Sequence, residues 1–230
     1  MEDFKKNLEV IEENICNACK KAGRSRDEVT LIAVSKTKPV EDLQAVYDLN
    51  IRDFGENKVQ ELKDKIEVMP EDIKWHMIGH LQRNKVKYII GKTSLIHSVN
   101  TVELAEEISK RSESNNVTTS VLLQANVSGE ESKHGFAPHE LKPAIDKIMA
   151  LPSIKVCGLM TMAPIEEYEG QAREVFAKTR VIFEDLKSYT GLECFNVLSM
   201  GMSDSYECAI EEGSTLVRVG SAIFGARHYQ

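Results

Sequence analysis

Apolar residues form two kinds of pattern along this chain. Phe4, Leu8, Ile11 and Ile15 recur at three- and four-residue spacing, which predicts an amphipathic helix over residues 2–22. The later apolar runs predict strands at 31–36, 51–56, 74–79, 95–99, 119–127, 154–162, 195–200 and 215–219. Helical patterns lie between most of them, at 40–49, 57–68, 101–112, 138–150, 167–189 and 204–211, and 81–91 is short enough for a turn or two of helix.

Strands that alternate with helices favour a parallel sheet joined by right-handed crossovers. The run 154–162 is almost wholly apolar, as expected for a strand covered by helices on its outer face. Eight such units in 230 residues suit the lower end of the range for an α/β (β/α)₈ TIM barrel. An open doubly wound sheet is the rival, but no G-x-G-x-x-G follows the first strand. No linker divides the chain, so we expect residues 1–230 to form a single barrel domain with an extra N-terminal helix.

Composition and charge narrow the classes of function. The net charge of −7 argues against a general nucleic-acid or anionic-membrane surface. No apolar run is long enough to span a bilayer, and the charged N-terminus lacks the apolar core of a signal peptide. Five cysteines without an export signal suggest free thiols in the cytoplasm. The Cys16–Cys19 spacing has no second pair for zinc, so we predict no metal site.

One lysine stands at the end of the first predicted strand. The apolar run that begins at Leu31 ends in Lys36 and is closed by Thr37, Lys38 and Pro39. Desolvation at a buried strand end disfavours the ammonium form and lowers the pKa of a lysine. A neutral amine is what Schiff-base formation with an aldehyde requires. The ordinary alternative is a lysine whose amine reaches water. The role of Lys36 therefore depends on which other residues lie at the same end of the barrel.

The active face of such barrels lies at the C-terminal ends of the strands, and the loops after strands seven and eight often bind phosphate. Ser199, Gly201, Gly220 and Ser221 lie in those two loops. Small residues let backbone N–H groups approach a phosphate, although Gly and Ser also make ordinary turns. The two loops together, opposite Lys36, favour a phosphate site.

Arg218 is a second unusual residue because it lies inside an apolar strand, Leu216–Gly220. A guanidinium that faces the barrel interior needs a partner, since unpaired burial of a charge is costly. The partner is either a carboxylate or an acceptor nitrogen of a heterocyclic ligand. An amine nucleophile, a phosphate cradle and a fixed cation together suit pyridoxal 5′-phosphate (PLP), which carries an aldehyde, a phosphate and a ring nitrogen.

Several roles are open to the histidines and to the remaining lysines. His76 and His80 are acid–base groups or hydrogen-bonded structure, and the sequence leaves their roles open. Lys133 and His134 lie on a loop after the fifth strand that either closes over the site or is solvated. Transfer of PLP from Lys36 to Lys38 or Lys133 during release is a hypothesis from their expected nearness.

Six segments, in order over nearly the whole chain, resemble the pyridoxal phosphate homeostasis proteins (the YggS/PROSC family). They are LIAVSKTKP at 31–39, FGENKVQE at 54–61, WHMIGHLQRNK at 75–85, GLMTM at 158–162, LSMGMSD at 198–204 and VRVGSAIFG at 217–225. The resemblance implies a barrel similar to the N-terminal domain of alanine racemase, with PLP held as a covalent aldimine on Lys36. It implies that Arg218 faces the pyridine nitrogen and that Asn57 lines the ring. The resemblance also implies that the phosphate is surrounded by Ser199, Met200, Gly201, Gly220 and Ser221.

Members of this family resemble non-catalytic PLP carriers that take part in vitamin B6 homeostasis and amino-acid balance. We therefore expect no catalytic residues, and PLP-requiring apoenzymes are the candidate acceptors. A PLP-dependent amino-acid racemase is the alternative, but an arginine at the ring nitrogen makes the cofactor a poorer electron sink. The chain also ends directly after the eighth unit, without the second domain of such racemases, and we expect a monomer. A cofactor-free Schiff-base aldolase is the third reading.

Overall fold

The structure is a computed structural model that describes residues 3–130, 134–164 and 168–225. Its strands are β1 (Thr30–Val34), β2 (Asp53–Glu56), β3 (Lys74–Met77), β4 (Leu95–Val99), β5 (Thr119–Gln124), β6 (Ile154–Met160), β7 (Val197–Ser199) and β8 (Leu216–Val219). Its helices are α1 (Phe4–Lys21), α2 (Val40–Asp48), α3 (Val59–Ile66), α4 (Val102–Ser114), α5 (Leu141–Met149), α6 (Gln171–Thr190), α7 (Tyr206–Glu211) and α8 (Ser221–Phe224). Short 3₁₀ turns occur at Arg26–Glu28, Arg83–Tyr88 and Pro138–Glu140.

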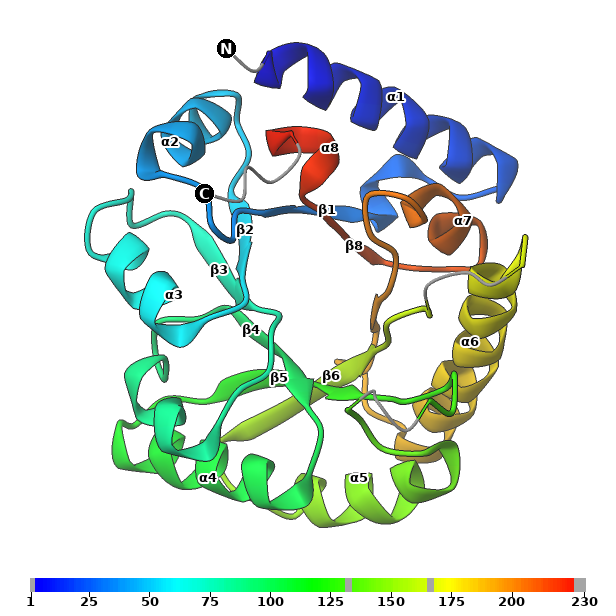
Figure 1. The fold of residues 1–230 in the computed structure, drawn as a ribbon. Helices are drawn as coiled ribbons and strands as arrows, with labels where there is room; N and C mark the ends of the chain where they lie inside the picture. The colour runs from blue at the N-terminus through cyan, green and yellow to red at the C-terminus, as the bar shows by residue number, and fades with distance from the viewer. Residues whose placement is uncertain (1–2, 131–133, 165–167, 226–230) are drawn as a thin grey trace.

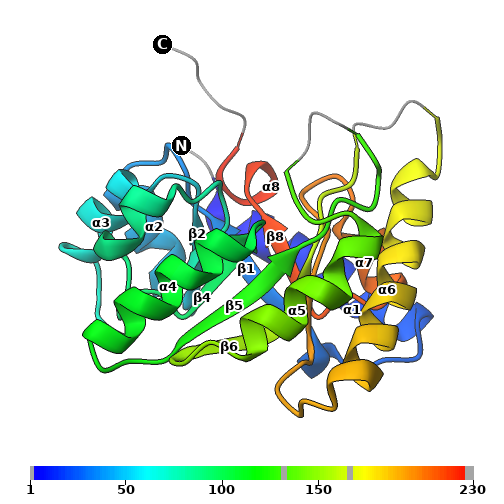
Figure 2. The ribbon, with the colours of Figure 1, turned by 90° about the horizontal axis from the view of Figure 1, so that it is seen from below.

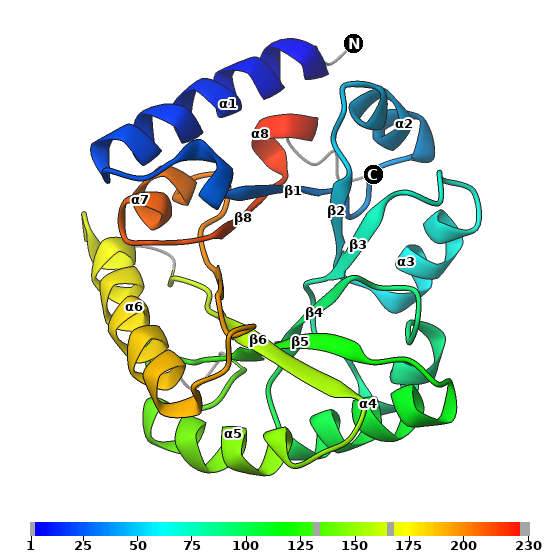
Figure 3. The same cartoon turned by 180° about the vertical axis from the view of Figure 1, so that it is seen from behind.

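The strands close into a parallel barrel in sequence order, with β8 paired to β1 (Figure 1). Ile32 pairs with Arg218 across that closing seam, and Phe54 pairs with Trp75 between β2 and β3. Helices ring the strands on the outside, as the view from behind also shows (Figure 3). The predicted (β/α)₈ barrel is therefore confirmed, and every strand points its C-terminal end to the same face.

Two apolar regions hold the barrel together. The larger one lies between the sheet and the helices and contains fully buried residues such as Phe54, Leu62 and Phe176. The smaller one fills the barrel interior and consists of Ile32, Val34, Leu95, Leu122, Cys157, Met160 and Leu216. Branched apolar side chains in layers are the usual filling of such barrels.

Helix α1 lies outside the ring, beside α7 and α8 (Figure 1). Asp3 caps its N-terminus by accepting from the Lys6 N–H, and the buried stripe of α1 includes Ile11 and Ile15. The Asn7 side chain donates to the Ile223 carbonyl at 2.9 Å, so α1 holds the short helix α8 in place. Figure 2 shows α8 at one end of the barrel, where the loops after β5 and β6 also lie.

The boundaries differ from the sequence predictions mainly at strand ends. Strand β1 stops at Val34, so Lys36 stands two residues beyond the strand rather than at its last position. The segment 81–91 holds the 3₁₀ helix Arg83–Tyr88, in agreement with the expected turn or two of helix, whereas the short helix α8 was not among the predicted helices. Within the described part of the chain, no helix is both long and apolar enough to cross a membrane.

Candidate functional site

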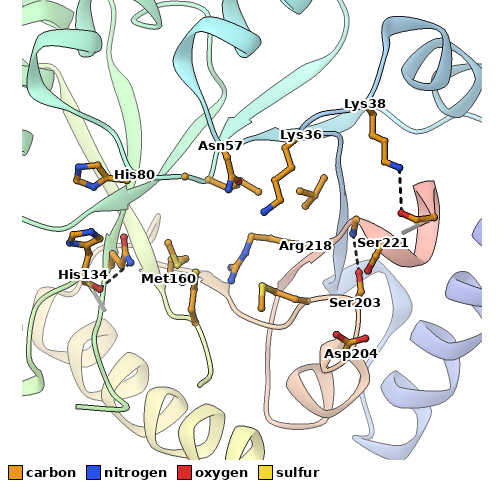
Figure 4. A pocket seen from close by; sticks show the side chains of 18 residues that line it. Lys36, Lys38, Asn57, His80, His134, Met160, Ser203, Asp204, Arg218 and Ser221 are labelled. Carbon is orange, nitrogen blue, oxygen red and sulfur yellow. Dashed lines mark hydrogen bonds between the residues drawn. The ribbon is translucent and has the colours of Figure 1, made fainter. Parts of the chain in front are cut away.

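A pocket of about 340 Å³ opens at the C-terminal ends of the strands (Figure 4). Its volume is in the range of small-molecule sites. Of the residues predicted to bind a cofactor, Lys36, Asn57, Arg218, Gly220 and Ser221 line it. Segments from both ends of the chain therefore meet in one cavity, as the barrel closure requires.

Lys36 extends from the loop after β1 toward the centre of this pocket (Figure 4). Its side chain is only half-buried, so the expectation of a buried lysine was wrong. The physical reason is that Lys36 lies past the strand end, at the open mouth of the barrel.

The residues on both sides of Lys36 are held by a charged cluster. The Lys65 ammonium donates to the Ser35 carbonyl at 2.8 Å and to one carboxylate oxygen each of Glu56 and Glu61 at 2.7 Å. The Ser35 hydroxyl donates to Glu56, and the Thr37 N–H donates to Glu61, both at 2.5 Å. The charged cluster therefore holds Ser35 and Thr37, the two neighbours of Lys36 in the chain.

Arg218 extends from β8 and is almost fully buried at the pocket floor. Its guanidinium donates to the Ser199 hydroxyl at 2.5 Å and to the Thr161 carbonyl at 3.0 Å. Burial lowers the pKa of Arg218 to about 10. No carboxylate of the described residues forms an ion pair with it, so the predicted carboxylate partner is not found there.

The loops after β7 and β8 meet at one serine that the sequence analysis left out of the site. The Ser203 hydroxyl accepts the backbone N–H groups of Gly220 at 3.1 Å and Ala222 at 3.4 Å. Gly220 precedes α8 and Ala222 lies in its first turn, and Figure 4 shows Ser203 beside Ser221 at the pocket wall. The Ser203 hydroxyl occupies both donors in this structure, and they converge on its oxygen as backbone N–H groups do around a bound anion.

The other end of α8 is held by Lys38, which also lines the pocket. The Lys38 ammonium donates to the Phe224 carbonyl at 2.7 Å and to the Gly225 carbonyl at 3.3 Å. A cation at the last carbonyls of a helix satisfies acceptors that the helix itself leaves unpaired. Lys38 therefore connects the Lys36 loop directly to α8.

Three predicted phosphate residues are not among the residues that line the pocket. Ser199, Met200 and Gly201 are buried, and Ser199 lies beneath Arg218. Gly201 has a φ of +94°, and a Cβ there would lie 2.6 Å from the Cβ of Ala209, so the turn after β7 requires glycine for packing. The pocket wall from this loop is instead Met202, Ser203 and Asp204.

Two histidines stand together at the edge of the pocket. The rings of His80 and His134 stack with centroids 4.7 Å apart, and both residues line the cavity (Figure 4). The loop after β5 thus reaches the loop after β3 across the pocket edge. Lys133, the second predicted acceptor of PLP, lies outside the described residues, so its distance from Lys36 stays a prediction.

The charges that line the pocket fit a small anion. Lys36, Lys38 and Arg218 are cationic, and Asp204 is the carboxylate among the lining residues described. This positive site occurs in a chain whose net charge is −7. A half-buried amine, a backbone donor set and a buried guanidinium match the aldehyde, phosphate and ring nitrogen expected of PLP. The residues present therefore fit that cofactor. Among the described residues, no group of three His, Cys, Asp or Glu side chains could hold a metal ion.

Comparison with known proteins assigns the chain to a family. The model of the alanine racemase N-terminal domain matches residues 7–228. A pyridoxal phosphate homeostasis protein of Aquifex aeolicus is 44% identical over 218 residues, which cover 94% of this chain and 95% of that protein. The chain belongs to the family of pyridoxal phosphate homeostasis proteins. The resemblance found in the sequence motifs is thereby confirmed.

Solved structures agree with this family and with its fold. PipY of Synechococcus elongatus, solved with PLP bound, has a TM-score of 0.81 and 30% identity, covering 94% of this chain and all of that one. Alanine racemase of Clostridium difficile has a TM-score of 0.78 at 16% identity. That match covers 99% of this chain but only 60% of the racemase, which shows a shared barrel.

Proposed function

We propose that this homeostasis protein binds PLP in the pocket at the barrel mouth, where the Lys36 amine condenses with its aldehyde carbon to a Schiff base and the aldehyde oxygen leaves as water. The observation that carries this proposal is the convergence of Lys36, Arg218 and the first turn of α8 on one cavity of about 340 Å³. The related PipY structure with PLP bound supports the same ligand.

Each group of the pocket has a task that its chemistry allows. The charged cluster around Lys65 orients the Lys36 loop. A phosphate that takes the place of the Ser203 hydroxyl would meet the backbone N–H groups of Gly220 and Ala222. Arg218 has no acceptor, so a ring nitrogen that faces it stays unprotonated. PLP with an unprotonated ring nitrogen stabilises carbanions weakly.

We infer from this electronic argument a carrier and regulator of PLP rather than an efficient racemase. Vitamin B6 homeostasis, delivery to PLP-requiring apoenzymes, a monomeric state and a cytoplasmic location belong to this proposal. The family name of the relatives supports the homeostasis role. Exchange of the α-deuterium of amino acids by the PLP-loaded protein, at turnover well above that of free PLP, would favour the racemase alternative.

The first test is the visible absorption spectrum during titration with PLP, with the Lys36→Ala variant alongside. We expect an absorption band in the parent that the variant lacks, and a borohydride-stable PLP adduct at Lys36 by peptide mass mapping. Lys5→Ala is a matched control because Lys5 is an exposed lysine on α1. An equal band in Lys36→Ala would refute the assignment of the lysine, and no band in the parent would refute PLP binding itself.

A further inference from the structure

A continuous row of polar side chains crosses the barrel interior below the pocket. It runs in the order Asp53 on β2, His76 on β3, His97 on β4, Ser199 on β7 and Arg218 on β8. The successive distances are 2.9 Å from Asp53 to His76, 3.0 Å from His76 to His97, 3.0 Å from His97 to Ser199 and 2.5 Å from Ser199 to Arg218. We call these five residues the relay. It replaces apolar side chains in the layer where such barrels usually place Val, Ile and Leu.

The direction of every hydrogen bond in the relay follows from its two ends, because the Arg218 guanidinium only donates and the Asp53 carboxylate only accepts. His76 therefore donates its proton from Nε2 to Asp53 and accepts at Nδ1 from the Nε2–H of His97. His97 in turn accepts at Nδ1 from the Ser199 hydroxyl, which accepts from Nη1 of Arg218. Two neutral histidines with the same tautomer complete the row without an unsatisfied atom.

Burial supports neutral rings and a charge at each end. His97 is fully buried, and burial, together with the nearby His76 and Arg218, holds its pKa well below the usual range. Arg218 is a buried cation, and no carboxylate in the described part of the chain contacts it directly. The Asp53 side chain is 19% exposed and lies at the start of β2, the opposite end of the barrel from the pocket. The relay therefore links a buried cation to an anion at the far face, and aligned hydrogen bonds in an interior strengthen one another.

We propose that Asp53, His76, His97 and Ser199 are positioning residues for Arg218, and that Asp53 serves as its counter-ion through the relay. Two bonds, to Ser199 and Thr161, fix the plane of the guanidinium at the pocket floor. The task of Arg218 toward a ligand rests on the proposed function, whereas the relay itself does not. A substitution of Asp53 should therefore alter how Arg218 is held at the pocket floor, although Asp53 itself does not line the pocket.

The first experiment uses the cofactor-free protein and tests the relay alone. Nitrogen-15 NMR of the histidine rings distinguishes Nε2–H, Nδ1–H and doubly protonated forms. We expect His76 and His97 to carry the proton on Nε2 at neutral pH. A proton on Nδ1 of either ring, or a doubly protonated His97, would overturn the direction of the relay.

The second experiment measures PLP affinity in variants. Asp53→Asn keeps the shape and an acceptor but removes the charge, and we expect PLP to bind about three- to ten-fold more weakly. Asp72→Asn is the matched control, because Asp72 precedes β3 at the same end of the barrel and pairs with Arg52 rather than with the relay. Unchanged affinity in Asp53→Asn, or an equal loss in Asp72→Asn, would overturn the proposal.

A third measurement separates positioning from simple loss of stability. PLP added to the parent should shift the nitrogen-15 signals of His97, and Ser199→Ala should abolish that shift while Ser199→Thr restores it. Ser109→Ala removes another buried serine, which bonds the Pro152 carbonyl far from the relay, and should leave the shift intact. Retention of the shift in Ser199→Ala would contradict the relay. If PLP fails to bind the parent, the proposed function is refuted. The tautomers of His76 and His97 in the cofactor-free protein then still test the relay.

Discussion

Replacement of Lys65 by methionine tests how the buried cluster stabilises the loop that carries Lys36. The Lys65 ammonium contacts three acceptors, on Ser35, Glu56 and Glu61. The Glu56 side chain has no exposed surface and that of Lys65 has 6%. Methionine keeps the length of the side chain but leaves the Glu56 charge buried without its cation. Breaking one partner of a buried pair in this way destabilises proteins by roughly 3–5 kcal/mol, and we expect a loss of that order at pH 8.

The pH dependence of that loss has a definite sign. Burial raises the pKa of Glu56, while the charge and hydrogen bond of Lys65 oppose the increase. Without Lys65 the folded-state pKa of Glu56 rises further above its unfolded value. A carboxyl with a raised pKa favours folding when it is protonated, and this contribution disappears as pH rises through the folded-state value. The Lys65→Met protein should therefore be less destabilised at pH 5 than at pH 8.

The assay is urea unfolding of cofactor-free protein at pH 5, 6.5 and 8, followed by fluorescence of Trp75, the single tryptophan, which is buried on β3. Glu56→Gln in the Lys65→Met background should recover most of the lost stability and remove its pH dependence, because no charge then remains to be buried. Lys142→Met, which breaks an exposed pair with Asp185, should change stability by less than about 1 kcal/mol. A loss in Lys65→Met that is equal at pH 5 and pH 8 would refute this reasoning.

Three further substitutions test the packing around the pocket. In Gly158→Ala the new Cβ would lie 1.8 Å from the Val197 carbonyl oxygen at a φ of +150°, and we expect about 4 kcal/mol or more of destabilisation by thermal unfolding; an unchanged melting temperature would contradict it. Lys38→Met removes the donor to the end of α8 and should weaken PLP binding roughly two- to ten-fold by calorimetry, whereas unchanged affinity would show that α8 needs no such support. Asn7→Ala removes the bond to the Ile223 carbonyl and should lower unfolding free energy by about 1 kcal/mol, so a stability gain would count against that bond.

The architecture was predictable because it depends on patterns that are local in sequence. Each strand is a short apolar run and each helix has its own period, so the alternation and the barrel follow from counting them. Helix α8 escaped prediction because four residues, Ser221–Phe224, are too few to show a helical period. Strand ends were overextended, as at Lys36, because the apolar pattern does not mark where ladder bonds stop.

The site was predictable only where a residue is unusual in its own segment. Lys36 and Arg218 stand out as charges next to or within apolar runs. His97 also lies within an apolar run, at 95–99, but its partner Ser199 is 102 positions away in sequence and reaches it only across the closed barrel, so the sequence does not reveal their contact. Ser199 was assigned to a phosphate loop, yet the barrel turns it inward beneath Arg218. Which face a strand-end side chain takes is decided by register, and the residue type does not reveal it.

The contact of α1 with α7 and α8 places a constraint on the order of events during synthesis. Helix α1 leaves the ribosome well before its packing partners Tyr206 and Phe224, which follow it much later in the sequence. Until residues 206–225 have emerged, α1 lacks its main native partners, α7 and α8, although α2 and the turn Arg26–Glu28 are already available to it. The pocket is also incomplete without Arg218, Gly220 and Ser221, so closure of the barrel and assembly of the pocket are a single late step, slowed by the long loop that must close.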